Sequence, residues 1–296
     1  MGQASEMKVN ACIRVSIAGF DFVISPLDAV QQQKAQNLKA FFSKEKHGIN
    51  LRVFSDGEIP DMPIDTRVFS SGSHWQLYRL NRDYCFKITS SEKNKEFISR
   101  LAVFPSDFSS SKIYTYSPVG DKGFPLEYPL DQILLIHLSA LNKGVLFHAC
   151  GVVLEKQGLI FVGHSGAGKS TIGGLFSEYK QALILSDDRI VVKKEGSDFR
   201  IHGTPWYGSL GLCSPSKARL KKIFFLKKSD KNSITPLSTC ESVKRLTSFS
   251  FLPYWEKTPL IKTLSTINSI ASSKNLCYEL SFKPDKDIVG LVEDVL

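Results

Sequence analysis

A glycine-rich loop between an apolar strand and a helix constrains this chain more than any other feature. The loop Gly163-His164-Ser165-Gly166-Ala167-Gly168-Lys169-Ser170 matches the pattern G-x-x-x-x-G-K-[ST]. It follows the apolar residues 159–162 and precedes a helix that we predict over 169–179. In this context the backbone N–H groups of the loop turn inward beside a helix N-terminus, where they bind phosphate oxygens. We therefore expect a nucleotide at this loop.

The polar side chains of the loop suit ATP with Mg²⁺. Lys169 is expected to neutralise the β- and γ-phosphates, and the Ser170 hydroxyl is a suitable Mg²⁺ ligand. Thr171 completes the predicted ATP-binding segment. The alternative is a glycine-rich turn without a ligand, but the apolar strand before the loop and the helix after it favour the nucleotide.

Two adjacent carboxylates, Asp187 and Asp188, follow a second predicted strand at 182–185. Neighbouring residues of an extended chain point to opposite sides, so one carboxylate can face Mg²⁺ while the other faces an incoming hydroxyl. The alternative is an acidic turn without metal. Further upstream, His148 lies between apolar residues, a setting that is more typical of a hydrogen-bonded core histidine.

Together these features resemble the catalytic domain of bacterial HPr kinase/phosphorylase, which has a nucleotide-binding fold like that of phosphoenolpyruvate carboxykinase. The resemblance covers about Leu130 to Leu226. It rests on the order and approximate spacing of His148-Ala149-Cys150-Gly151-Val152-Val153, the glycine-rich loop and Ser186-Asp187-Asp188-Arg189. It implies a divergent HPr-kinase-like serine kinase with a mixed-sheet P-loop domain.

The resemblance also implies a role for each matching residue. Asp187 would be the general base on the substrate serine, and Asp188 with Ser170 would hold Mg²⁺. His148 would lie near the γ-phosphate of ATP, beside Lys169. At this point the two aspartate roles remain interchangeable.

The chain departs from the HPr kinase pattern in three places. Thr171 stands where these kinases usually have an acidic residue, the N-terminal half has no counterpart, and His202–Gly208 occurs in place of the family's arginine-containing loop. We therefore expect a serine of another protein or peptide as the acceptor. The segment His202–Gly208 is either an active-site loop, with Trp206 or Tyr207 packed on a base or substrate, or a structural hairpin turn.

The net charge of the chain indicates which classes of ligand it favours. Lys and Arg number 38 against 29 Asp and Glu, which gives a net charge of +9 and favours polyanionic ligands. Half of the residues in 217–228 are basic, as a solvated rim or as a contact for phosphate or an acidic peptide. No nucleic-acid-binding motif is present, so a nucleic-acid partner is the weaker alternative. The other alternative function is that of an ATP-binding regulator without phosphotransfer.

The overall pattern predicts an α/β or α+β protein with two domains. Residues 1–128 would form a β-rich domain suited to substrate recognition, with a half-buried antiparallel sheet and helices at 27–46 and 92–100. Residues 129–296 would form the ATP-binding catalytic domain. There we expect a buried helix at 131–143 capped by Gly144, a strand-turn-strand at 144–154, and two C-terminal helices, one beginning with a capping box at Ser238.

The remaining features concern location and assembly. The first residues lack a signal-peptide pattern and no apolar run is long enough to span a bilayer, so we expect a cytoplasmic protein without a membrane partner. The six cysteines are scattered singly, as is typical of buried free thiols. A homo-oligomer is compatible with the sequence.

Overall fold

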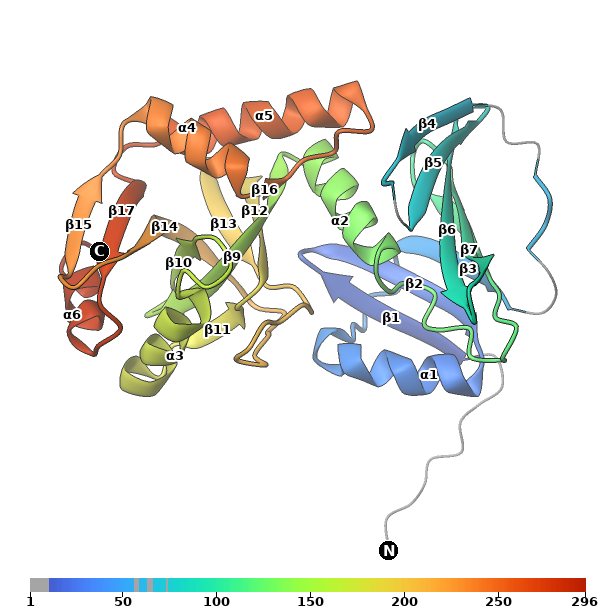
Figure 1. Ribbon diagram of the computed structural model, residues 1–296, viewed down its shortest axis with the longest axis horizontal. Coiled ribbons are helices and arrows are strands. Elements are labelled where there is room, and N and C mark those ends of the chain that lie inside the picture. The colour runs from blue at the N-terminus through green and yellow to red at the C-terminus, as the bar shows by residue number, and fades with distance from the viewer. Residues whose placement is uncertain (1–10, 56–58, 63–65, 73) are drawn as a thin grey trace, which may run out of the picture. The chain divides into compact units, whose positions relative to one another are not determined.

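The structure is a computed structural model that describes residues 11–55, 59–62, 66–72 and 74–296, and it divides into two compact units. One unit holds the residues up to Ser16 together with Phe20–Leu134, and the other holds Ile17–Gly19 and Leu135–Leu296. Each unit is built around one mixed β-sheet with helices, which makes the protein an α+β protein (Figure 1). The domain roles assigned to residues 1–128 and 129–296 stay predictions.

The first unit is an eight-stranded sheet within the described residues, in the order β1-β2-β3-β8-β7-β6-β5-β4. Its elements are β1 (Ala11–Ile17), β2 (Phe20–Leu27), α1 (Ala29–Ala35), η1 (Gln36–Phe41), β3 (Ile49–Phe54), β4 (Thr66–Ser70), β5 (Trp75–Leu80), β6 (Asp83–Glu92), β7 (Lys95–Phe104) and β8 (Ser110–Thr115). The expected antiparallel sheet is present from β4 to β8. The expectation is wrong for β3, which runs parallel to both β2 and β8. The helices α1 and η1 form the crossover that a parallel pair requires.

Two predicted helices of this unit are corrected. The helix expected over 27–46 is shorter, since α1 and η1 end at Phe41. The helix expected over 92–100 is wrong: Lys95–Phe104 is strand β7, paired with β6. Lys93 and Asn94 both have positive φ angles, 48° and 63°, which suit the two-residue turn of a β-hairpin. The turn therefore overrides the weak helical periodicity.

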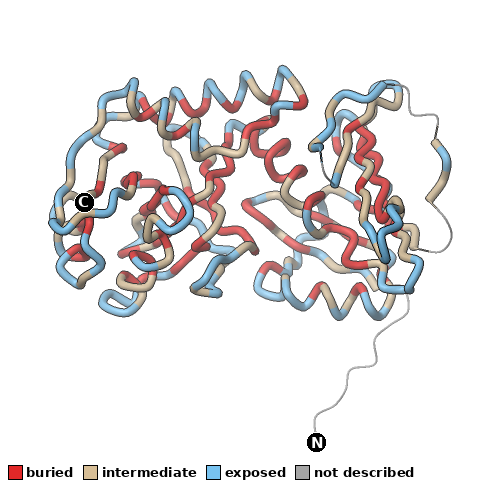
Figure 2. Tube along the Cα trace, viewed as in Figure 1, coloured by how far each residue is buried: buried red, intermediate tan, exposed pale blue. Residues whose placement is uncertain are grey.

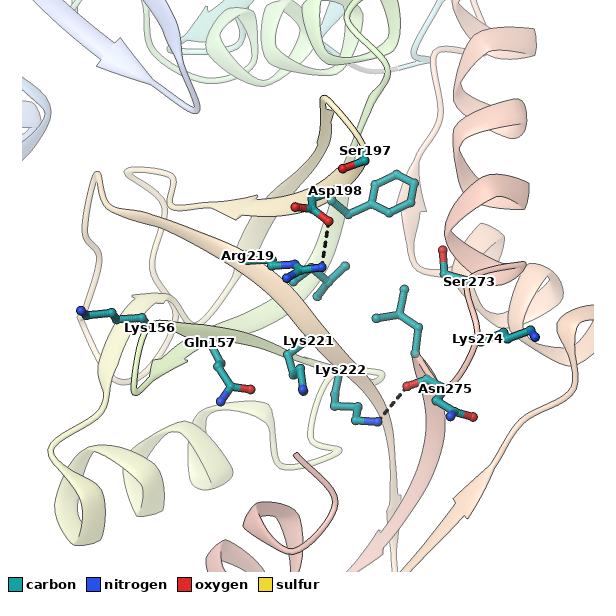
Figure 3. A pocket seen from close by; sticks show the side chains of 13 residues that line it. Lys156, Gln157, Ser197, Asp198, Arg219, Lys221, Lys222, Ser273, Lys274 and Asn275 are labelled. Carbon is teal, nitrogen blue, oxygen red and sulfur yellow. Dashed lines mark hydrogen bonds and ion pairs between the residues drawn. The ribbon is translucent and has the colours of Figure 1, made fainter.

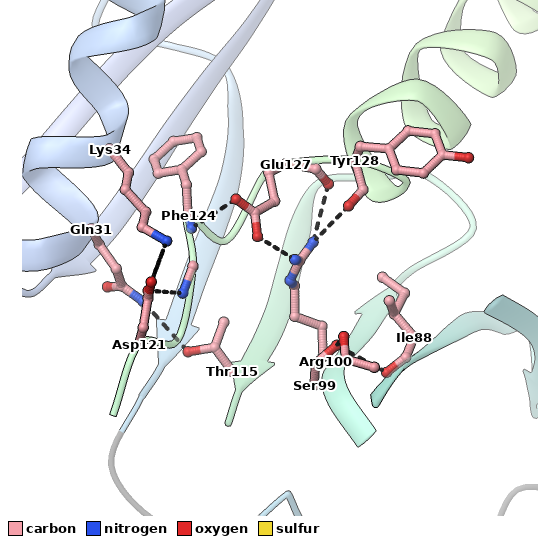
Figure 4. A network of polar contacts seen from close by, with 12 residues as sticks. Gln31, Lys34, Ile88, Ser99, Arg100, Thr115, Asp121, Phe124, Glu127 and Tyr128 are labelled. Atoms are coloured by element: carbon pink, nitrogen blue, oxygen red, sulfur yellow. Dashed lines mark hydrogen bonds and ion pairs between the residues drawn. The ribbon is translucent and has the colours of Figure 1, made fainter. Parts of the chain in front are cut away.

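A network of polar contacts holds the segment that follows β8 against the sheet (Figure 4). Buried Arg100 on β7 pairs with the Glu127 carboxylate and donates to the Glu127 carbonyl over 3.1 Å. Burial lowers the pKa of Arg100, and Glu127 opposes that shift. Lys34 of α1 contacts Asp121 at 2.7 Å. The segment 117–125 thus has no helix or strand, and ion pairs hold the chain at Asp121 within it and at Glu127 just after it.

The second unit contains a nine-stranded sheet in the described part of the chain. The helix α2 (Leu130–Leu141) begins in the first unit and ends in the second. The other elements of the second unit are β9 (Gly144–Leu154), β10 (Gln157–Val162), α3 (Lys169–Lys180), β11 (Leu183–Ser186), β12 (Arg189–Glu195), β13 (Asp198–His202), β14 (Lys217–Lys228), β15 (Ser233–Pro236), α4 (Thr239–Ser248), β16 (Ser250–Phe251), α5 (Lys257–Ala271), β17 (Cys277–Phe282) and α6 (Asp287–Glu293). The order is β10-β9-β12-β13-β14-β17-β15, and β14 also pairs with β10. The strands β10, β9, β12, β13 and β14 therefore form a closed ring.

The central strand β9 differs from the prediction in two respects. The strand-turn-strand expected at 144–154 is one continuous strand. Gly151 does not mark a turn but allows close packing, because a Cβ there would lie 2.4 Å from Ile190 Cδ1. Gly144 is the first residue of β9, and Lys143 takes the left-handed conformation after α2 with φ 54°. The predicted cap at Gly144 is therefore displaced by one residue.

Helices cover both faces of this sheet. Ile160 and Phe225 pack with Leu246 of α4 and Ile267 of α5 in one cluster. Alternate residues of the same strands point the other way, so that Phe161 packs with α3 and α6 in a second cluster. Figure 2 shows the buried residues along the central strands, with buried and exposed residues alternating along α5. The strand β10 is thus buried on both faces up to its last residue.

The C-terminal part contains more structure than predicted. The two expected helices are α4 and α5, and the strands β15 and β17 and the helix α6 accompany them. Ser238 caps α4 by accepting from the Glu241 N–H over 3.2 Å, but the Glu241 side chain pairs with Arg245, so the capping box is half formed. None of the helices in the described part of the chain has the length and apolar character needed to cross a bilayer.

All six cysteines are free, and Cys12 and Cys240 are exposed, which corrects the expectation that all are buried.

Candidate functional site

The glycine-rich loop connects the end of β10 to the start of α3 and depends on two glycines. A Cβ at Gly163 would lie 2.7 Å from the Cβ of Ala167, so the loop closes too tightly for a side chain there. Gly168 has φ 104°, and a Cβ would lie 2.5 Å from the Phe282 ring. Glycine is therefore required at both ends of the loop, where the backbone turns into the first residue of α3.

Lys169 lies folded over this loop. Its side chain is buried, and Nζ donates to the Gly163 carbonyl over 2.8 Å and to the His164 carbonyl over 3.1 Å. Burial lowers the pKa of Lys169, while the charges of Asp188 and Asp187 act in the opposite direction. A cation is thus held at the loop with two carboxylates in its electrostatic neighbourhood.

Asp187 is almost completely buried, with 2% of its surface exposed. Its Oδ2 accepts from the Ser170 hydroxyl over 2.9 Å and from the Leu210 N–H over 2.9 Å. Its Oδ1 accepts from the Gly208 N–H over 2.7 Å. Three donors therefore fix this carboxylate beside the hydroxyl that ends the glycine-rich loop.

Asp188 faces a different set of partners and is more accessible, with 21% of its side chain exposed. Oδ1 lies 3.3 Å from His148 Nδ1, and Oδ2 lies 2.9 Å from the Arg189 guanidinium. The hydrogen bond from His148 is the main cause that lowers the pKa of Asp188, and the positive charge of Arg189 adds to it. Asp188 is therefore an ionised carboxylate with an open side.

His148 reaches Asp188 because β9 and β12 are neighbours. His148 is the register partner of Arg189 across these strands, and the Ala149 N–H donates to the Asp188 carbonyl over 3.0 Å. The His148 side chain is 35% exposed. It is therefore a half-exposed partner of a carboxylate, and the alternative of a fully buried core histidine does not describe it.

The segment 203–214 surrounds the two aspartates. The Ser186 hydroxyl donates to the Trp206 carbonyl over 2.6 Å and accepts from the Asp188 and Arg189 N–H groups. The Arg189 guanidinium lies over the Trp206 ring, 5.3 Å from its centroid. The predicted alternatives for His202–Gly208 are thus decided in part: Gly208 contacts Asp187, and Trp206 packs on Arg189.

Three residues that shape the site received no role from the sequence: Ser186 and Gly208, which were named only as parts of longer segments, and Leu210. Gly208 and Leu210 contribute backbone N–H groups, which any residue type carries. A Cβ at Gly208 would lie 2.9 Å from Asp187 Oδ2, so glycine at this position lets the backbone approach the carboxylate closely. Ser186 precedes the two aspartates, and its hydroxyl is a typical organiser of a tight turn.

The other predicted residues lie around the loop. His164, Ser165, Gly166 and Thr171 are exposed and Ala167 is half-buried. The His164 ring lies 4.7 Å from the Phe249 ring. Beneath the loop, burial strongly raises the pKa of Cys150, which keeps this thiol protonated and unreactive.

The oxygen atoms of Ser170 and Asp187 are the donors that fit a magnesium ion. No group of three or more His, Cys, Asp or Glu side chains in the described residues is arranged to hold a metal by itself. Mg²⁺ is commonly held by one or two protein oxygens together with substrate phosphates, and the adjacent hydroxyl and carboxylate match that pattern.

Comparisons with known proteins give a partial match. The family model for the SynChlorMet cassette protein ScmC matches residues 130–270. Among solved structures, the HPr(Ser) kinase/phosphatase from Coxiella burnetii is 15% identical, with 51% of this chain and 92% of that chain covered and a TM-score of 0.28. No curated protein matches the chain.

Proposed function

We propose that the chain is an ATP-dependent kinase that transfers the γ-phosphate to a hydroxyl, most simply the serine of a protein or peptide. The observation that carries this proposal is the meeting of the glycine-rich loop with two differently held aspartates, through the contact between Ser170 and Asp187 at 2.9 Å. A strand–loop–helix with this motif is the usual cradle for nucleotide phosphates. We accordingly propose a P-loop domain of the HPr kinase type in residues 129–296, in a cytoplasmic protein.

In this proposal the loop and Lys169 bind the phosphates of ATP. The N–H groups at the start of α3 and the Lys169 ammonium supply positive charge where the β- and γ-phosphates would lie. Lys169 Nζ donates hydrogen bonds to two carbonyl oxygens of the loop. Phosphate oxygens of ATP can replace these carbonyl oxygens as acceptors. Bound Mg²⁺ would supply further neutralisation of the phosphates, held by Ser170 and one carboxylate.

We assign that metal-side carboxylate to Asp187, which reverses the roles first expected for the two aspartates. Asp187 is buried and already bonded to the Ser170 hydroxyl, so an incoming serine has little access to it. Asp188 has an exposed side and a histidine partner. A general base must come within hydrogen-bond reach of the hydroxyl whose proton it accepts, which favours Asp188.

The chemical step then uses residues with separate tasks. The serine oxygen forms a bond to the γ-phosphorus, the bond from phosphorus to the ADP oxygen breaks, and Asp188 accepts the hydroxyl proton. His148 holds Asp188 in place through Nδ1, and Arg189 fixes the second carboxylate oxygen. Because phosphoryl transfer depends mainly on positioning and charge stabilisation, these contacts supply what the protein must contribute.

Transfer of labelled γ-phosphate from ATP to serine peptides tests the proposal. The acceptor set is a library of peptides with one serine each, paired with peptides in which alanine replaces that serine. We expect Mg²⁺-dependent label on serine peptides alone. ATP binding without transfer to any hydroxyl would identify a regulatory ATP-binding protein instead, and the absence of ATP binding would reject both.

A further inference from the structure

A basic pocket of about 570 Å³ lies at the far end of β10 and β14 from the glycine-rich loop (Figure 3). The register pairs Gln157 with Arg219 at the pocket and Val162 with Phe225 at the loop. With about 3.3 Å per strand residue, the two sites are roughly 15–20 Å apart. The pocket is therefore separate from the proposed nucleotide site.

Positive charge dominates the walls of this pocket. Its basic side chains are Lys156, Arg219, Lys221, Lys222 and Lys274. Asp198 is the single acid among its described lining residues, and it pairs with Arg219 at 2.9 Å. The remaining cations come from three separate segments, the turn after β9, strand β14 and the turn before β17. The chain thus gathers excess positive charge at one place in space.

Lys222 is the buried member of this group. It is 7% exposed, and Nζ donates to the Asn275 carbonyl over 2.8 Å and to the Tyr278 hydroxyl over 3.1 Å. Both acceptors are neutral. The Tyr278 ring also lies 4.7 Å from Nζ, so these partners of the ammonium carry no full negative charge. An anion in the pocket would supply that charge, which favours an anionic ligand at this position.

The pocket also lies at a gap in strand pairing. On the side opposite β10, strand β13 pairs with β14 up to Arg219, and β17 pairs with β14 from Ile223 onward. Within the described residues, no strand pairs with 220–222 on this side. A short open strand edge at the floor of a pocket accepts an extended peptide through main-chain hydrogen bonds.

One more lining residue distinguishes a peptide from a simple anion. Gln157 Oε1 is buried and has no hydrogen-bond donor within the described part of the chain. Its carbonyl oxygen needs an N–H or O–H group. A phosphate ion at neutral pH can donate only through its remaining O–H, whereas an extended peptide offers an N–H at each unit.

A second pocket of about 420 Å³ is a neighbour of the first, and Phe199 lines both. It adds three lysines, Lys143, Lys194 and Lys262, beside the exposed side chain of Ile261. The two pockets together suit an extended ligand with several negative charges and an apolar side chain, rather than a compact ion.

We propose that the two pockets bind an extended acidic segment of a partner protein or peptide, with its backbone paired to residues 220–222 and its carboxylates on the surrounding lysines. The proposal is independent of phosphotransfer, because it concerns the opposite end of the sheet.

The test measures binding of a fluorescent peptide of about ten residues in which Glu alternates with Val, enough to span both pockets in an extended conformation. Fluorescence anisotropy would follow the full-length chain and the variant Lys221→Glu/Lys274→Glu, both at exposed positions. We expect the double variant to weaken binding at least about tenfold. The matched control Lys228→Glu/Lys231→Glu makes the same change in net charge on exposed residues outside the pockets, and it should keep binding within about twofold.

Two further probes decide the kind of ligand. The same peptide with every second amide N-methylated loses the strand-pairing donors, and we expect it to bind several-fold more weakly. A single-stranded oligonucleotide of equal charge should bind more weakly than the peptide. The proposal is overturned if the control variant weakens binding as much as the pocket variant, if N-methylation has no effect, or if the oligonucleotide binds more tightly.

Discussion

The Ser170 hydroxyl donates to Asp187 Oδ2 over 2.9 Å, and this contact joins the end of the glycine-rich loop to the pair of aspartates. The same carboxylate accepts from the N–H groups of Gly208 and Leu210. A carboxylate with three donors is held in one orientation. The site therefore combines one rigid carboxylate, Asp187, with a more accessible one, Asp188.

The first prediction concerns the hydroxyl of Ser170. Ser170→Ala removes one of the two oxygens proposed for Mg²⁺, so the Mg²⁺ concentration needed for half-maximal ATP binding should rise by about tenfold or more. Ser170→Thr keeps the hydroxyl and should stay close to the native protein. Calorimetric titration of ATP at several Mg²⁺ concentrations measures this, and equal Mg²⁺ requirements for all three proteins would remove Ser170 from the metal site.

A second prediction separates the two aspartates. Asp188→Asn keeps the shape and removes the basicity, so the rate of phosphate transfer should fall about 10²–10⁴-fold while MgATP affinity stays within a few-fold. Asp187→Asn should mainly raise the Mg²⁺ requirement. Single-turnover transfer with saturating MgATP gives both quantities. The opposite pattern, with transfer lost in Asp187→Asn at saturating Mg²⁺ and preserved in Asp188→Asn, would restore the first assignment.

The third prediction uses two neighbouring glycines of α3. A Cβ at Gly173 would lie 2.8 Å from Cys150 Sγ, whereas a Cβ at Gly174 would make an ordinary contact with Leu210 at 3.5 Å. Gly173→Ala should therefore lower the free energy of unfolding by about 1–3 kcal/mol through overpacking. Gly174→Ala should leave it unchanged or raise it by about 0.5–1 kcal/mol through helix propensity. Denaturant unfolding compares the pair, and equal losses would contradict the close approach of α3 to β9.

The fourth prediction concerns pH. Burial, with the positive charge of Lys193, lowers the pKa of His202 from 6.5 to about 4, although Glu195 opposes the shift. The unfolded chain therefore binds a proton at this histidine below pH 6.5 that the folded protein binds only near pH 4. Its stabilising contribution is complete above pH 6.5 and is lost as the pH falls toward 4.

His202→Asn removes that contribution, so its unfolding free energy should fall less steeply than that of the native protein between pH 6.5 and 4. Urea unfolding at closely spaced pH values supplies the two curves. Curves of equal slope would show that His202 titrates alike in the folded and unfolded chains.

Much of the candidate site could be predicted because its signals are local. The glycine-rich loop lies between a strand and a helix in a single stretch of sequence, and Asp187 with Asp188 directly follows a strand. The contact of His148 with Asp188 depends on the pairing of β9 with β12, which no local pattern specifies. Backbone donors such as the Gly208 N–H have no sequence signature at all.

The dependence on contacts between distant segments also explains where the predicted fold was wrong. Strand alternation predicted a sheet in the first unit, but the direction of β3 depends on the crossover through α1 and η1. The segment at 92–100 became a strand because Lys93 and Asn94 adopt left-handed conformations in a hairpin turn. Neither residue is glycine, so the usual turn signal was missing.

Calorimetric titration of MgATP decides whether the glycine-rich loop binds the nucleotide through Lys169. The comparison is between the native chain, Lys169→Ala, and the control Lys180→Ala at the other end of α3, where Lys180 pairs with Glu293 at 2.7 Å. We predict that Lys169→Ala weakens MgATP binding at least about tenfold and that Lys180→Ala leaves it unchanged. Equal binding by the native chain and Lys169→Ala would show that Lys169 does not hold the nucleotide at this loop.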